Sequence, residues 1–130
     1  MMDIAVDTSA IVELMVEGPR AESVDEALAT AGLALVTSVA RVEAAMVLMG
    51  RHGWGRTEFN RYWNALAVQE VTVDAAISEL AIDAFELWGR GRGKAALNFG
   101  DCFSYALAKA RNVPLLCVGN DFRKTDLRTV

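Results

Sequence analysis

Two aspartates in this chain stand where the apolar segments before them end. Asp7 directly follows Ile4-Ala5-Val6, and Asp121 comes shortly after the apolar segment from Leu115 to Val118. In open α/β sheets, ligands bind at the carboxyl ends of the strands, so acids in these places are candidates for metal binding. Each could instead be a helix cap, because aspartate is strongly favoured at the residue that precedes a helix. Both interpretations stay open for the two aspartates taken singly.

Glu43 lies on an apolar stripe of a predicted helix, since its neighbours three and four positions away are Val39, Ala40, Met46 and Val47. A glutamate in such a place is either a boundary residue or a buried charge, and buried charges are nearly always paired or bound to metal. No Lys or Arg lies within helical pairing range of it. The pattern therefore favours a metal-binding or catalytic role.

Asp101 stands at the first turn of another predicted helix, where the helix dipole favours a negative charge. Stability alone could explain it. However, Cys102, Phe103, Ala106 and Leu107 follow it and have the character of core residues. We therefore expect Asp101 at the seam between the core and the edge of the sheet.

Four acids gathered at one sheet edge would repel one another and raise each other's pKa unless a cation were present. The four are Asp7, Glu43, Asp101 and Asp121. Mg²⁺ or Mn²⁺ suits such an all-oxygen site, whereas His52 is the only histidine and zinc lacks a ligand cluster. The chemistry that suits a hard divalent metal among carboxylates is phosphodiester hydrolysis.

The elements that must position these acids alternate along the chain. Four apolar runs predict strands at Ile4–Val6, Leu33–Val36, Val68–Val73 and Leu115–Val118. Helices are predicted over Glu13–Ala31 (broken into two at Gly18-Pro19), Val39–Arg51, Arg56–Ala67, Ala75–Trp88 and Asp101–Arg111. This alternation predicts an α/β fold, a three-layer α/β/α domain with a mainly parallel central sheet covered on both faces.

Composition limits the remaining possibilities. A chain of 130 residues, 53% of them hydrophobic, is expected to form one domain over residues 1–130. No apolar run approaches the roughly 18 residues of a membrane span, and the first residues do not resemble a signal peptide, so a cytoplasmic location is expected. Cys102 and Cys117 lack the spacing of a zinc or redox site and are expected to be buried as apolar residues. The net charge of -4 argues against a nucleic-acid partner, but bound divalent cations would cancel much of it locally.

The chain resembles the PIN-domain ribonuclease toxins of the VapC type from bacterial toxin–antitoxin pairs, from end to end. The resemblance rests on Ile4 to Ala10, Thr37-Ser38 with Val42-Glu43, Ala96 to Ala108, and Val118 to Phe122 followed by Thr125-Asp126. It implies an endoribonuclease that uses Mg²⁺ or Mn²⁺ and is inhibited by a small VapB-type antitoxin, in a complex that binds operator DNA. It also implies catalytic and metal-binding roles for Asp7, Glu43, Asp101 and Asp121, with Ser9, Asn120 and Asp126 as supporting groups.

Several basic residues are candidates for RNA contact. Arg90, Arg92 and Lys94 lie in the glycine-rich segment from Gly89 to Lys94, here called the basic loop, shortly before Asp101. Phosphate recognition needs some such cations. The antitoxin is expected to cover apolar surface near the first helices with an amphipathic helix and to direct a basic side chain at the acids. The apolar composition also predicts a homodimer.

Two other classes of protein stay as alternatives. Phosphatases and receiver domains also carry aspartates at the ends of parallel strands, but the segment Asp7-Thr8-Ser9 lacks the second aspartate of a haloacid-dehalogenase-type phosphatase. No paired acids stand where a receiver domain would have them, although Asp3 is close by. A non-catalytic PIN-fold interaction module would be favoured by loss of any of the four acids, and all four are present.

Overall fold

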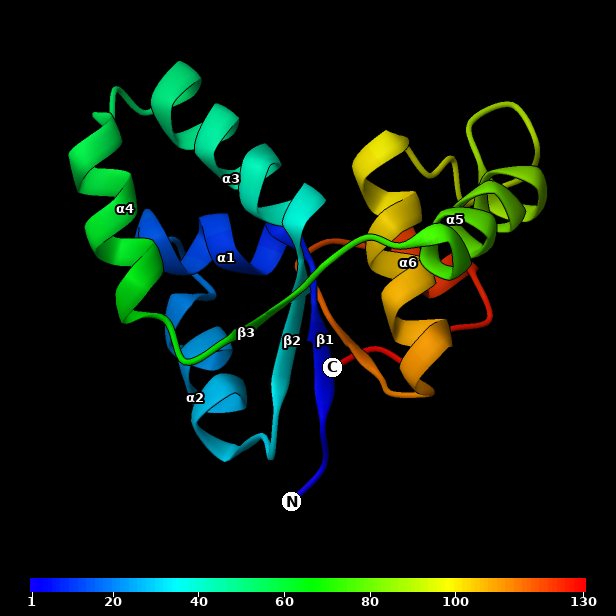
Figure 1. Cartoon of the computed structure of the whole chain (residues 1–130), viewed down its shortest axis with the longest axis horizontal. Helices are drawn as coiled ribbons and strands as arrows, with labels where there is room; N and C mark the ends of the chain where they lie inside the picture. The colour runs from blue at the N-terminus through cyan, green and yellow to red at the C-terminus, as the bar shows by residue number, and fades with distance from the viewer.

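A four-stranded sheet lies at the centre of the computed structural model, which describes residues 1–130 (Figure 1). The strands are β1 (Ile4–Val6), β2 (Ala34–Thr37), β3 (Gln69–Val71) and β4 (Leu115–Leu116). The helices are α1 (Thr8–Met15), α2 (Ala21–Thr30), α3 (Ser38–Arg51), α4 (Arg56–Ala65), α5 (Ala75–Trp88) and α6 (Phe99–Arg111), with a short 3-10 helix η1 (Asp121–Lys124).

All strand pairs are parallel, and their order across the sheet is β3-β2-β1-β4. In register, Ala5 of β1 pairs with Leu35 of β2 on one side and with Leu115 of β4 on the other. The first and last strands are therefore neighbours. Their carboxyl ends, and the residues that follow them, meet at one edge of the sheet.

Side chains of the central strands point alternately to two apolar cores, as expected for strands buried on both faces. Ile4 and Val6 pack with residues of α1, α2, α3 and α4, whereas Ala5 packs with residues of α5 and α6. Figure 1 shows α1 to α4 on one side of the sheet and α5 with α6 on the other. The three-layer α/β/α architecture predicted from the sequence is thus present.

The element boundaries differ from the sequence-based prediction mainly at helix starts. The first helix begins at Thr8 and not at Glu13, because Asp7 caps it directly at the end of β1. The last long helix begins at Phe99, two residues before the predicted Asp101, because Asn98 forms a capping box with Asp101. β1 has the predicted bounds and β2 is shifted by one residue, whereas β3 and β4 are shorter than predicted.

Two expectations about burial and membranes can be compared with the structure. Cys102 is buried and Cys117 is half-buried, and both are free thiols. None of the helices combines the length and the apolar character needed to cross a bilayer.

Candidate active site

Asp7 connects β1 to α1 and is only 3% exposed. Its Oδ2 accepts a hydrogen bond from the backbone N–H of Ser9 at 3.0 Å, which makes it the N-cap of α1. Its Oδ1 is buried and has no hydrogen-bonding partner in the protein. Buried carboxylate oxygens are rarely left without a partner. The capping role is real, but it uses one oxygen and leaves the other free for a ligand.

Glu43 is carried by α3, which starts directly at the end of β2. Thr37 ends β2 and caps α3, since its hydroxyl accepts a hydrogen bond from the N–H of Ala40 at 3.0 Å. Glu43 follows in the second turn and is half-buried. The nearby Arg41 pairs with Glu70 at 3.6 Å and not with Glu43. The carboxylate of Glu43 lies instead against Gly100 of α6, where a Cβ atom would overlap it.

Asp101 is the third residue of α6 and is 9% exposed. It accepts a hydrogen bond from the N–H of Asn98 at 3.1 Å, and its own N–H donates to the Asn98 side chain at 2.9 Å. Burial raises the pKa of Asp101 from 3.8 to about 7, against the lowering effect of the Asn98 hydrogen bond. The carboxyl group of Asp101 is therefore only partly ionised near neutral pH in the metal-free protein.

Three further charges contribute to that raised pKa: those of Asp7, Asp121 and Glu43. Asp121 begins η1 just beyond β4 and is exposed. The Cys117 thiol is affected by three of the same acids. Burial, and then the charges of Asp7, Asp101 and Asp121, raise its pKa to about 11. The structure thus places the other three acids named from the sequence within electrostatic range of Asp101.

The four carboxylates fit an Mg²⁺ or Mn²⁺ ion that keeps water ligands better than an ion enclosed entirely by side chains. No three His, Cys, Asp or Glu side chains are close enough together to hold an ion by themselves. Mg²⁺ and Mn²⁺ sites do not need such a closed group, because these ions keep several water ligands and bind one or two carboxylates directly. The unpartnered Oδ1 of Asp7 and the raised pKa of Asp101 mark a place that favours a positive charge.

Two of the predicted supporting residues lie near the acids. The Ser9 hydroxyl accepts a hydrogen bond from the N–H of Val118 at 3.0 Å and so ties α1 to the segment after β4. Asn120 is exposed and precedes η1, without a side-chain hydrogen bond to that helix. Ser9 therefore orders the chain that leads to Asp121, and Asn120 is free to face solvent or a ligand.

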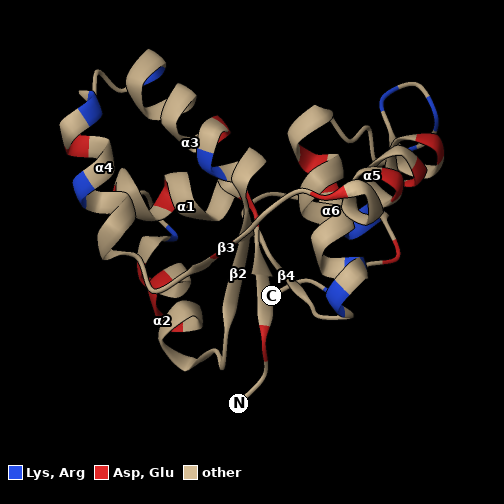
Figure 2. Cartoon of the chain, in the orientation of Figure 1, with Lys and Arg blue, Asp and Glu red and all other residues tan.

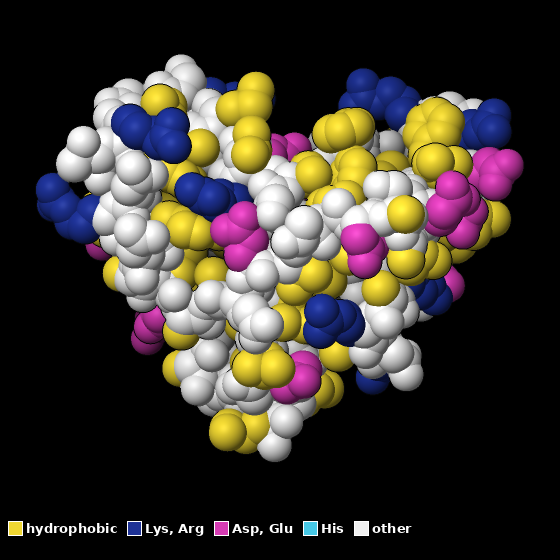
Figure 3. Space-filling model, in the orientation of Figure 1, with side chains coloured by type: hydrophobic (Ala, Val, Ile, Leu, Met, Phe, Trp, Pro, Cys, Tyr) yellow, Lys and Arg dark blue, Asp and Glu magenta, His cyan; other side chains and the backbone are white.

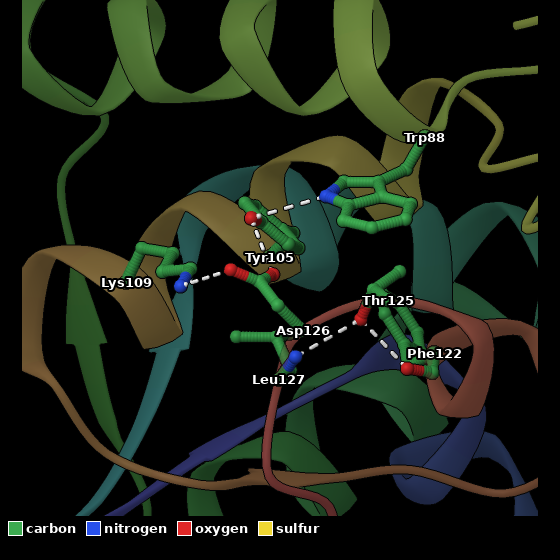
Figure 4. Close-up of polar contacts among 7 residues, drawn as sticks. All are labelled: Trp88, Tyr105, Lys109, Phe122, Thr125, Asp126 and Leu127. Atoms are coloured by element: carbon green, nitrogen blue, oxygen red, sulfur yellow. Dashed lines mark hydrogen bonds and ion pairs between the residues drawn. The ribbon is translucent and has the colours of Figure 1, made fainter. Parts of the chain in front are cut away.

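Asp126 belongs to a different group of contacts (Figure 4). Its Oδ1 accepts a hydrogen bond from the Tyr105 hydroxyl at 2.7 Å, and its Oδ2 binds Lys109. Trp88 Nε1 donates to the Tyr105 oxygen at 3.2 Å. Although burial opposes it, the hydrogen bonds from Lys109 and Tyr105 lower the pKa of Asp126. Asp126 is not among the charges that act on Asp101, so the structure gives it a role in joining the C-terminal segment to α6 and α5.

Two grooves share Phe99, which is 74% exposed. One, with a volume of about 790 Å³, is lined by Glu43 and Arg51 of α3 together with Phe99. The other, about 660 Å³, runs between α5 and α6 and is lined by Arg90, Phe85 and Phe99. An aromatic side chain and a cation are thus available in each groove.

The basic residues lie on both sides of the acids. Figure 2 shows Lys and Arg on α3 and α4 and, across the molecule, on the basic loop after α5. Arg90, Arg92 and Lys94 are all exposed, and the Arg92 guanidinium lies 5.6 Å from the centre of the Phe85 ring. In Figure 3 the surface is notched between the two lobes, an acidic group is visible at the base of the notch, and basic side chains are spread over both lobes and the face between them.

Sequence analysis missed three residues near the acids. The hydroxyl groups of Thr8 and Ser104 are buried without a partner, and Gly100 packs against the carboxylate of Glu43. Spacing offered a signal for Ser104, because a residue three positions after Asp101 lies on the same helix face. Nothing in the sequence near Gly100 indicated its contact with Glu43, because this contact arises only where α3 packs against α6.

Comparisons with known proteins agree with this architecture. Residues 4–127 match the PIN domain family. Ribonuclease VapC30 of Mycobacterium tuberculosis is 38% identical over 128 residues, which cover 98% of each chain. Among solved structures, Mycobacterium tuberculosis VapC20, a Sarcin-Ricin loop cleaving toxin, matches with a TM-score of 0.76 at 18% identity over 98% of both chains. VapBC2 from Rickettsia felis, bound to a DNA fragment from their promoter, matches with a TM-score of 0.70 at 13% identity, covering 98% of this chain and 96% of that one.

The family match covers almost the whole chain, and the similarity to the ribonuclease from Mycobacterium tuberculosis extends over the same span. The structural neighbours share the fold at much lower identity. This chain belongs to the PIN-domain family and, within it, to the VapC type.

Proposed function

We propose that this protein is a metal-dependent endoribonuclease and the toxin of a toxin–antitoxin pair. The observation that carries the proposal is that the charges of three acids, Asp7, Glu43 and Asp121, act on the buried carboxyl of Asp101, whose pKa reaches about 7. The name of the relative VapC30 as a ribonuclease supports RNA as the substrate. The exposed arginines on both sides of the acids supply the cations that an RNA backbone requires.

Asp7, Glu43, Asp101 and Asp121 would hold Mg²⁺ or Mn²⁺, some of them through water. When bound, such an ion supplies an activated water molecule and neutralises charge on the phosphate. The chain would orient these carboxylates. The capping hydrogen bonds at the starts of α1 and α6 hold the side chains of Asp7 and Asp101 in place, while the side chain of Asp121 is exposed to solvent. Ser9 supports the site by ordering the segment before Asp121.

The substrate is proposed to be single-stranded or looped RNA, where the phosphate can reach an acid at the floor of a hollow. Arg51 and the basic loop would bind its backbone from the two sides. Contacts of this kind position the strand without selecting its sequence. Exposed Phe99, which lines both grooves, offers a surface on which a base can stack.

The proposed partners are a VapB-type antitoxin, a second copy of the chain and, through the antitoxin complex only, operator DNA. The promoter-bound complex among the structural neighbours supports the antitoxin and the DNA. Exposed apolar side chains on α3 support the dimer, because side chains of this kind gather at interfaces between subunits. They include Val42 at 58% and Met46 at 69% exposure.

The experiment is incubation of the purified protein with total RNA, and in parallel with a phosphate monoester, in Mg²⁺, in Mn²⁺ and in excess EDTA. We expect RNA cleavage in either metal, none in EDTA, and no monoester hydrolysis. Cleavage that persists in excess EDTA would remove the metal mechanism. Hydrolysis of the monoester alone would favour a phosphatase.

A further inference from the structure

Gly100 occupies a helical position that does not require glycine. It is the second residue of α6, and its φ is not in the left-handed region. Glycine is among the least favourable residues inside a helix because it loses the most backbone freedom. A glycine here must therefore be explained by what surrounds it.

The surroundings of Gly100 point to one partner. The three nearest atoms to a Cβ placed on it are the two carboxylate oxygens of Glu43 and the carbon that bears them, and all three would overlap it. No backbone atom of α3 is among them. A methyl group at this position would therefore first meet the end of a flexible side chain, which can move aside without a shift of the α3 backbone.

The place that Glu43 occupies has a consequence for the acids. Gly100 is adjacent to Asp101, a residue that is only 9% exposed, so Glu43 lies beside that buried acid. The first turn of α6 also attracts a negative charge through its unpaired N–H groups. Displacing the Glu43 carboxylate would move it away from both.

We propose that Gly100 is a positioning residue, whose missing side chain leaves the space that lets Glu43 reach the same divalent cation as Asp101. This role rests on the proposed metal site. It predicts that a methyl group at position 100 weakens metal binding without weakening the fold.

The test uses the full-length chain and four variants: G100A, G50A, E43A and the double variant G100A/E43A. Gly50 is the matched control, because it lies in α3 and a Cβ there would meet nothing within 4 Å. Mn²⁺ alone is titrated by calorimetry, without RNA, and melting temperatures are measured in EDTA. In the E43A background the obstructing carboxylate is gone, so the double variant isolates the contact.

We expect G100A to lower Mn²⁺ affinity about tenfold, the order found when a group that orients a metal ligand is lost. G50A should stay within about twofold of the parent, and both single glycine variants should melt at or above the parent temperature in EDTA. E43A should lose affinity, and adding G100A to it should cause no further loss.

Parent-like Mn²⁺ affinity in G100A would overturn the proposal, and so would an additional loss in the double variant. If G100A fails to fold, folding of G100A/E43A supports the clash with Glu43, whereas failure of both overturns it. A parent protein that binds no Mn²⁺ would instead overturn the metal site itself, together with this role for Gly100. Weaker binding in E43A combined with parent-like binding in G100A would overturn only the glycine's role.

Discussion

Replacing Asp101 by Asn should stabilise the metal-free protein at pH 8. The native pKa of Asp101 is raised from 3.8 to about 7 by burial, and by the charges of Asp7, Asp121 and Glu43. A carboxyl group with a raised native pKa contributes stability that is fully present below its unfolded pKa and is lost as the pH rises through the native value. At pH 8 the ionised Asp101 therefore destabilises the metal-free fold.

The magnitude follows from the difference between 3.8 and about 7, which at 1.36 kcal/mol per pKa unit corresponds to about 4 kcal/mol at pH 8. Water in the hollow screens one side of the carboxyl, which reduces this to about 2–4 kcal/mol. Asn keeps the capping geometry but loses the favourable charge at the first turn, at a cost of up to about 1 kcal/mol. The expected net gain at pH 8 is about 1–3 kcal/mol, or about 4 °C in melting temperature for each kcal/mol.

The assay is thermal unfolding of the parent and Asp101→Asn in EDTA, at pH 8 and at pH 5. At pH 5 the native carboxyl group of the parent is already protonated. The destabilisation of the parent by Asp101, before any correction for screening, then falls to about 1.5 kcal/mol, so most of the stability gained by the Asn variant should disappear. Mn²⁺ should raise the melting temperature of the parent more than that of the variant, because it binds the native parent more tightly. A variant less stable than the parent by about 1 kcal/mol at both pH values would mean that Asp101 is only a first-turn charge.

Three further outcomes test separate parts of the structure. Reversing the charges of Arg90, Arg92 and Lys94 to Glu should weaken RNA binding at all sequences and flatten its salt dependence, measured by fluorescence anisotropy at several salt concentrations; an unchanged slope would exclude the basic loop from the interface. Asp126→Asn should cost about 1 kcal/mol of stability through its lost ion pair and hydrogen bond, yet leave Mn²⁺ affinity within about twofold; a large loss of affinity would restore Asp126 as a metal-site residue. Met46→Glu should shift the chain from dimer to monomer in light scattering, and a parent that is monomeric at high concentration would contradict the dimer.

The fold was predictable because its strands are short, apolar and separated by helical patterns. Alternation of strands and helices favours parallel pairing with helices on both faces. It does not determine that β1 and β4 are neighbours, which only the structure shows. Helix starts were less predictable, because the capping residue sets the first residue of a helix, whereas the prediction relied on the periodicity of apolar residues. Thr8 to Val12 contain too few periodic positions to mark a helix, so Asp7 as a cap was needed to place its first residue.

Single acidic residues of the candidate site could be named from the sequence, but their contacts in three dimensions could not be predicted. Asp7 and Asp121 were indicated by their position after strands, and Glu43 by the lack of a local cation. Asp126 shows the limit of this reasoning. Its place in the chain resembles that of a supporting acid, yet Tyr105 and Lys109 of α6 take up both of its oxygens. Long-range contacts of this kind leave no trace in local spacing.

Under the proposed function, the distribution of charge explains how an acidic chain could act on RNA. Its formal net charge is -4, yet the charges of Asp7, Glu43 and Asp121 act together on Asp101, and exposed Lys and Arg side chains are present elsewhere on the surface. Without a cation, these acids would repel a phosphate. The burial of Asp101, together with the charges of Asp7, Asp121 and Glu43, would also destabilise the fold where Asp101 is ionised. A divalent ion removes both penalties at once. If the protein has the proposed function, RNA binding and metal binding are linked, and by reciprocity each should strengthen the other by the same factor.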